Sequence, residues 1–237
     1  MTAALPKTND PGPKVNSLTT ALPAEVPSET RVLLTGISWE TYERLLVEAG
    51  ENRNQLFAYC DGILEIMVPL EGHEEPARLS DDFVAVFVDE LGLELRKLGS
   101  LTMKNPQQKK GLEPDCCFYI QNEAVVRGVE KLDFEVHPPP DLVVEVDNSS
   151  SSLNKFPIYV ALKIPEIWRI RRDTLTIYRL DDAQASYTET EQSVAFPQLP
   201  VRELPQCMAR AKAIGQRAAV RELAERVRQI LAELDQS

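Results

Sequence analysis

The fold of this chain is constrained most by the stretch Pro138-Pro139-Pro140-Asp141-Leu142-Val143-Val144-Glu145-Val146-Asp147. An apolar, β-branched run that follows prolines predicts a strand over residues 142–146. We also predict a helix over residues 153–162 and a strand over residues 167–170, which together make a βαβ crossover. The region around this crossover is therefore expected to be an α/β fold with a mixed sheet flanked by helices.

The predicted strand carries acidic residues on one face. Because side chains alternate along a strand, Asp141, Glu145 and Asp147 share that face. A crossover helix implies a sheet that is buried on both faces, and buried carboxylates must be paired, hydrogen-bonded or bound to metal. An edge strand with its charges turned to solvent is the alternative reading.

Further elements are expected on both sides of this stretch. The dipeptide Asp61-Gly62 favours a tight hairpin between strands at residues 56–59 and 63–68, and Ser38 is a plausible helix N-cap. Helical spacing of apolar residues predicts a long helix over residues 74–98. The remaining strands are predicted at residues 101–104, 115–120, 175–180 and 186–190.

The two ends of the chain differ from the middle. Residues 1–30 are rich in proline, serine and threonine, which predicts a flexible tail, and the first ordered element is expected near Ser38. Residues 31–204 form the predicted domain. A C-terminal amphipathic helix is expected over residues 205–237, with an apolar seam at Val220, Leu223, Val227, Ile230 and Leu234. That seam suits either packing on its own domain or a coiled coil in a homodimer.

Composition narrows the class of protein. With 43% hydrophobic residues the chain can bury a sizeable core, and the sequence has neither a membrane-spanning apolar stretch nor a signal-peptide pattern, so a cytoplasmic protein is expected. The four cysteines lack metal-site spacing and are expected to be reduced. A net charge of -11 argues against a protein that coats nucleic acid, so any DNA contact must be local. The GxSxG, Walker and GxGxxG patterns are absent from the sequence.

Other acids and a histidine are candidates for the same site. Asp115 directly follows Pro114 at the start of a hydrophobic strand, where α/β folds tend to place ligands. Glu65 lies in the strand after the Asp61-Gly62 turn, and a solvent-facing position is its alternative. His73 precedes the long helix and can serve either the site or a capping or surface role.

Asp115, Glu145 thirty residues later, and Lys155 ten residues after that form a recognisable arrangement. It resembles the PD-(D/E)xK nucleases and, within them, the Uma-type family of restriction-endonuclease-like proteins. The segments PPDLVVEV (139–146) and KFPIYVALKIPEIWRI (155–170) carry the resemblance, which covers residues 39–204. It implies a restriction-endonuclease-like mixed sheet with Pro114-Asp115 as the PD element and Glu145 as the second acid.

The resemblance also implies a cofactor. Asp115, Glu145 and the carbonyl of Val146 would bind Mg²⁺ or Mn²⁺, and Glu65 would complete the shell or help to bind a second ion. The superfamily lysine normally follows the second acid by two residues, and Asp147 stands there in this chain. Lys155, on the predicted helix, is expected to take over its role. The serines at 149–152 replace a segment that is often more polar or acidic in relatives.

Three functions are compatible with these features. The first is a DNA endonuclease with a local basic rim made of Lys104, Lys109, Lys110, Arg169, Arg171 and Arg172. The second is a non-catalytic interaction module that retains the fold, which the negative net charge and Asp147 favour. The third is a metal-dependent hydrolase with another substrate. Similarity of fold alone does not choose among them.

Overall fold

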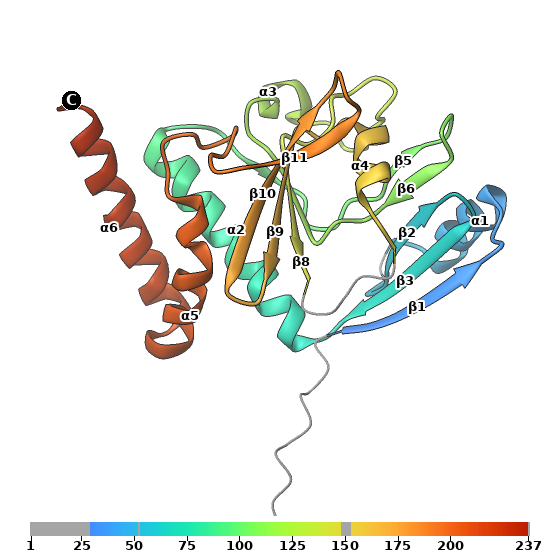
Figure 1. Cartoon of the computed structure of the whole chain (residues 1–237), viewed down its shortest axis with the longest axis horizontal. Coiled ribbons are helices and arrows are strands. Elements are labelled where there is room, and N and C mark those ends of the chain that lie inside the picture. Colours follow the sequence, from blue (N-terminus) through green and yellow to red (C-terminus); the bar gives the residue numbers. More distant parts are fainter. Residues whose placement is uncertain (1–28, 52, 148–152, 237) are drawn as a thin grey trace, which may run out of the picture.

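The structure is a computed structural model, and it describes residues 29–51, 53–147 and 153–236. It contains two β-sheets with helices packed against them (Figure 1). The first sheet is antiparallel throughout, and its strands are, in spatial order, β1 (Glu29–Thr35), β3 (Ile63–Pro69), β2 (Leu56–Cys60), β6 (Lys110–Leu112) and β5 (Met103–Asn105). Helix α1 (Trp39–Ala49) packs on it through Trp39, Tyr42 and Leu46.

The second sheet contains the predicted crossover. Its strands are, in spatial order, β11 (Ser186–Thr190), β10 (Thr174–Asp181), β9 (Glu166–Arg171), β8 (Leu142–Val146), β7 (Cys116–Tyr119) and β4 (Arg96–Lys97). Strands β8 and β9 are parallel and are joined through α4 (Phe156–Leu162), whereas the other neighbours are antiparallel. This confirms the mixed α/β architecture.

The two faces of β7 and β8 bury different cores. Cys116 and Val144 pack in a core with α2 (Glu71–Leu91), α5 (Leu204–Ile214) and α6 (Gln216–Leu234). Cys117 and Val143 pack on the opposite face with residues of α4 and of the first sheet. Burial on both faces explains the apolar composition of β8. The short helices α3 (Glu123–Val126) and η1 (Val201–Glu203) complete the described elements.

The first described element differs from the prediction. Strand β1, which begins at Glu29 and pairs with β3 over its whole length, precedes the helix expected near Ser38. Ser38 does cap α1, because its side chain accepts a hydrogen bond from the backbone N–H of Thr41. The predicted tail included Glu29 and Thr30, which belong to β1, and its remaining residues, 1–28, lie outside the described residues.

Two further expectations need correction. Helix α2 ends at Leu91 instead of residue 98, because Gly92 adopts a left-handed conformation with φ +64° that terminates the helix. The strands do not form a single sheet. The β2–β3 hairpin pairs with β1 and β6 instead of extending the sheet of β7 and β8, and β6 was not predicted because it is only three residues long.

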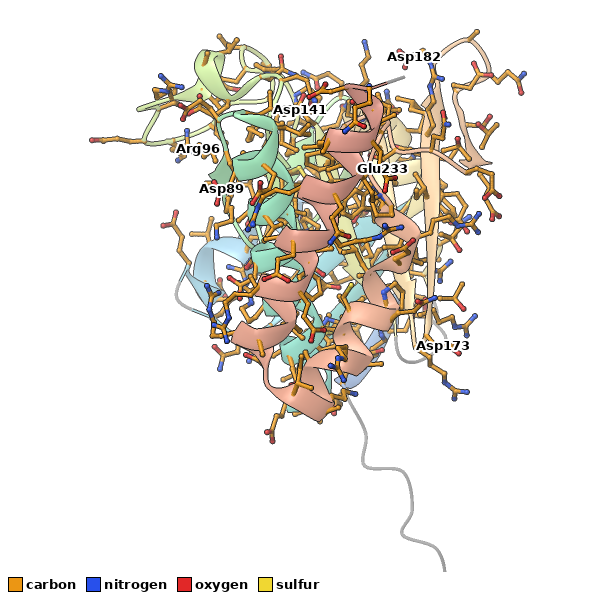
Figure 2. All side chains as sticks on the ribbon, turned by 90° about the vertical axis from the view of Figure 1, so that its left-hand side faces the viewer. Asp89, Arg96, Asp141, Asp173, Asp182 and Glu233 are labelled. Atoms are coloured by element: carbon orange, nitrogen blue, oxygen red, sulfur yellow. The ribbon has the colours of Figure 1, made fainter. Side chains whose placement is uncertain are left out.

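The predicted C-terminal helix is divided into α5 and α6 at Gly215, which has φ +92°. Its apolar seam packs within the same chain: Val220, Leu223 and Val227 are buried in the core that includes α2. Figure 2 shows α5 and α6 covering this side of the molecule. The structure therefore presents the packing alternative, and a homodimer through this helix stays a prediction. In the part of the chain that the structure describes, no helix combines the length and apolar character needed to span a membrane.

Candidate active site

Asp115 and Glu145 come from neighbouring antiparallel strands. The register pairs Cys116 with Val144, so Asp115 and Glu145 are the next residues to face each other. Directly opposed residues have Cβ atoms about 4.5–5.5 Å apart. The Oδ2 atom of Asp115 accepts a hydrogen bond of 2.7 Å from the backbone N–H of Val146. Both acids are buried, with relative exposures of 4% and 8%.

Glu145 is held by two side chains from the start of α4. The Nζ atom of Lys155 lies 2.8 Å from its Oε2, and the hydroxyl of Tyr159 donates to its Oε1. Burial raises the pKa of Glu145, and Asp115 adds to that effect, while Lys155 opposes it. Burial alone would lower the pKa of Lys155, but the charges of Glu145 and Asp115 outweigh it and the net pKa is raised. Lys155 is therefore an ammonium ion at neutral pH.

His73, at the start of α2, connects Asp115 to a residue that the sequence did not single out. Its Nδ1 lies 2.8 Å from Oε2 of Glu29, and its Nε2 lies 2.9 Å from Oδ1 of Asp115. Both contacts are ion pairs when the imidazole is protonated. Burial lowers the pKa of His73, but the two carboxylates outweigh that effect and raise it to about 10.

Glu65 is buried on β3 and pairs with Arg31 of β1. The guanidinium of Arg31 lies 2.6 Å from Oε1 of Glu65 and 2.9 Å from Oε1 of Glu29. Arg31 and Glu29 were not predicted as site residues, because they lie at the boundary of the predicted tail. The run Val32-Leu33-Leu34 that follows them was the available signal for a strand.

The other acids of the key stretch have different surroundings. Asp147 is buried and pairs with Arg169 of β9. The carboxylate of Asp141 instead accepts hydrogen bonds from the backbone N–H groups of Ile120 and Asn122, at 2.7 and 3.0 Å. Asp173 lies in the turn after β9, the strand parallel to β8. Figure 2 shows Asp141 toward the opposite end of the molecule from Asp173. Asp141 thus holds a loop at the end of β8 away from Glu145.

The residues of the predicted basic rim come from two separate parts of the fold. Lys104, Lys109 and Lys110 belong to the β5–β6 hairpin and are paired with Glu43, Glu40 and Asp61. The arginines 169, 171 and 172 belong to β9 and the turn that follows it. The acidic partners reduce the positive charge of the hairpin, whereas Arg169 pairs with Asp147 at the candidate site.

The donor atoms suit a hard divalent cation, although a full set of protein ligands is not assembled. Within residues 29–51, 53–147 and 153–236, no three His, Cys, Asp or Glu side chains are grouped so that they could hold a metal ion. Mg²⁺, however, is commonly bound by one or two carboxylates, with water and substrate phosphate supplying the rest. Asp115 and Glu145 meet that smaller requirement, because their carboxylates come from facing positions on β7 and β8. The residues therefore fit such an ion.

Comparison with known proteins places the chain in a family. Residues 39–210 match the profile of the Uma2 family, which is described as "Putative restriction endonuclease". The chain belongs to the Uma2 family. This match confirms the family expected from the Pro-Asp strand, Glu145 and the segment 155–170. A comparison with curated protein sequences gives no match.

One solved structure similar to this Uma2 chain is a "putative nuclease belonging to DUF820" from Anabaena variabilis ATCC 29413. The two share 18% sequence identity, and the alignment covers 72% of this chain and 92% of the other, with a TM-score of 0.44.

Proposed function

We propose that this Uma2 protein is a metal-dependent endonuclease that hydrolyses phosphodiester bonds in DNA. The observation that carries the proposal is the convergence of Asp115, Glu145 and Lys155 from three separate segments, with Nζ of Lys155 2.8 Å from Oε2 of Glu145. The family description supports a nuclease in general. Mg²⁺ is the proposed ion, with Mn²⁺ as its usual substitute.

Asp115, Glu145 and the carbonyl of Val146 would bind the ion. Once bound, it would lower the pKa of a coordinated water and offset charge on the scissile phosphate. The hydrogen bond from the Val146 N–H to Oδ2 fixes the orientation of the Asp115 carboxylate. Tyr159 does the same for Glu145 by donating to Oε1.

Lys155 would take the role of the superfamily lysine. The charges of Glu145 and Asp115 raise the pKa of Lys155, which favours its charged ammonium form. Its three N–H donors can orient a water molecule and offset negative charge on the phosphate. The pairing of Asp147 with Arg169 removes the conflict at the usual lysine position, since the extra carboxylate is balanced by a cation of its own.

His73 and Glu65 have supporting roles in the proposal. His73 contacts Asp115 and Glu29, so it would position Asp115 and offset its charge. Glu65 is paired with Arg31 and would reach a second ion only after that pair opens. Arg31 and Arg169, with Arg171 at the end of β9, form the proposed phosphate-binding surface. The cytoplasmic location remains a prediction from the sequence.

A cleavage assay tests the proposal directly. Purified full-length protein is incubated with duplex and single-stranded DNA in Mg²⁺ or Mn²⁺, alongside Glu145→Ala and the matched control Glu189→Ala, whose side chain is exposed on β11. Cleavage that disappears in Glu145→Ala and persists in Glu189→Ala supports the endonuclease. If the parent protein cleaves neither substrate with either ion, the non-catalytic module is the better reading.

A further inference from the structure

A cavity of about 320 Å³ adjoins the proposed active site. Glu145 and Asp147 line one side of it, and Arg31, Lys155 and Arg169 add positive charge. Its remaining wall includes the apolar side chains of Leu153, Phe156 and Ile167, together with Asn154 and Tyr159. The volume lies at the lower end of the roughly 300–1,000 Å³ of small-molecule sites, so the cavity is too small for a duplex and suits one nucleotide.

The aromatic part of the wall packs on other aromatic rings. The ring of Phe156 lies edge-on to Tyr178, with centroids 4.9 Å apart, and tilted relative to Tyr187 at 5.5 Å. Phe156 is the first residue of α4 and directly follows Lys155. An aromatic ring therefore lines the cavity next to the residue whose ammonium group contacts Glu145. Aromatic rings can stack on the π-face of any nucleobase.

Asp147 supplies a polar group that is not otherwise used. Its side chain has a relative exposure of 6%, and Arg169 Nε donates to its Oδ2 at 3.0 Å. Its other oxygen, Oδ1, is buried and has no hydrogen-bond partner. An unpaired buried acceptor is costly, and a ligand with an N–H donor would remove that cost. Every nucleobase carries an N–H donor on its Watson–Crick edge when it is unpaired.

We propose that this cavity receives one unpaired nucleobase of the substrate strand, stacked near Phe156 and donating to Asp147. The inference rests on the proposed function, because it places the neighbouring phosphate at Glu145 and Lys155. A paired base is stacked within the helix and must be extruded first, at a cost of a few kcal/mol. The substrate class is therefore single-stranded DNA, or duplex DNA with an unpaired nucleotide.

The test measures binding without cleavage. In EDTA, fluorescence anisotropy compares the affinity of the full-length protein for three labelled probes of equal length: a single-stranded oligodeoxyadenylate, a single strand of abasic sites and an oligodeoxyadenylate–thymidylate duplex. The variants are Phe156→Ala and Phe156→Leu, which keeps apolar packing against Tyr178 but has no aromatic face. Arg171→Ala, an exposed cation at the end of β9, is the control for charge. Thermal melting verifies that each variant is folded.

The wild-type protein should bind the base-bearing single strand about tenfold or more tightly than the abasic strand or the duplex. Phe156→Ala should remove most of this preference, Phe156→Leu should reduce it, and Arg171→Ala should change the single-strand affinities by a common factor. The inference would be overturned if the wild-type protein bound the base-bearing and abasic strands equally tightly, or bound the duplex as tightly as the single strand. It would also be overturned if Phe156→Ala weakened binding to the base-bearing and abasic strands by the same factor. Base-dependent binding without cleavage in Mg²⁺ or Mn²⁺ would instead overturn the proposed nuclease function alone.

Discussion

Lys155 lies ten residues after Glu145 in the chain, and its Nζ is 2.8 Å from Oε2 of Glu145. Lys155 directly precedes α4, so its position follows from the crossover that joins β8 to β9. The same crossover brings Tyr159 to the other oxygen of Glu145. The parallel strand pair and the helix between them thus assemble a cation and a hydroxyl around one buried acid.

Replacing Lys155 by Met should reduce DNA cleavage about 100-fold or more, because the loss of one well-placed donor to a developing charge has effects of this size. The side chain keeps its length but loses its charge. Single-turnover cleavage rates measure the effect. Lys212→Met, an exposed position on α5, is the matched control and should leave the rate unchanged. Normal cleavage by Lys155→Met would contradict the role assigned to this lysine.

Mg²⁺ or Mn²⁺ should raise the melting temperature of the wild-type protein. An ion that binds the native state stabilises it by about 2.7 kcal/mol at a hundredfold excess over Kd. Glu145→Gln should weaken this response, because the amide keeps the shape of the side chain but removes the charge that the ion would neutralise. Differential scanning calorimetry with and without the ion measures both effects. A wild-type protein that is indifferent to millimolar cation would argue against a metal site.

His73→Asn should lower the free energy of unfolding by about 3 kcal/mol, since it leaves the buried carboxylates Glu29 and Asp115 without their shared cation. Urea denaturation measures the change. Adding Glu29→Gln removes one of the two carboxylates that His73 contacts, so the double variant should be destabilised by less than the sum of the two single changes. Simple additivity would mean that the two residues do not interact in solution.

Asp141→Ala should destabilise the protein by about 2 kcal/mol without altering its response to metal. Its carboxylate accepts hydrogen bonds from the backbone of Ile120 and Asn122, and charge-assisted bonds of this kind are typically worth about 1.5–3 kcal/mol. Urea denaturation and the metal-dependent melting shift separate the two properties. A reduced melting shift would show that Asp141 belongs functionally to the acids around Glu145.

Val227→Ala should lower the free energy of unfolding by about 1–2 kcal/mol, because the side chain is fully buried in the core that contains α2. The loss should not vary with protein concentration, since the contact lies within one chain. Thermal melting over a wide concentration range provides the measurement. Leu234→Ala is the control, because that side chain is 43% exposed. A concentration-dependent loss would favour the homodimer.

Much of the candidate site followed from local pattern. The alternation along β8 and the proline before Asp115 marked two acids at the ends of buried strands, and the 155–170 segment predicted the crossover between β8 and β9. The two acids and the crossover could be predicted because each is encoded by residues close together in the sequence. Even the divisions at Gly92 and Gly215 have a sequence signal, because glycine readily takes the positive φ found at both.

The sequence by itself therefore determined the α/β class, the β8–α4–β9 unit and Asp115, Glu145 and Lys155 as the candidate set. Only the tertiary structure decided that β1 joins β3, so that Arg31 meets Glu65 and Glu29 meets His73. It also decided that Asp147 pairs with Arg169 and that the C-terminal seam packs inside the chain. The physical reason is that strand pairing and ion pairing between distant segments depend on which surfaces pack against each other in the folded chain. The periodicity of one segment indicates only which of its own faces is apolar.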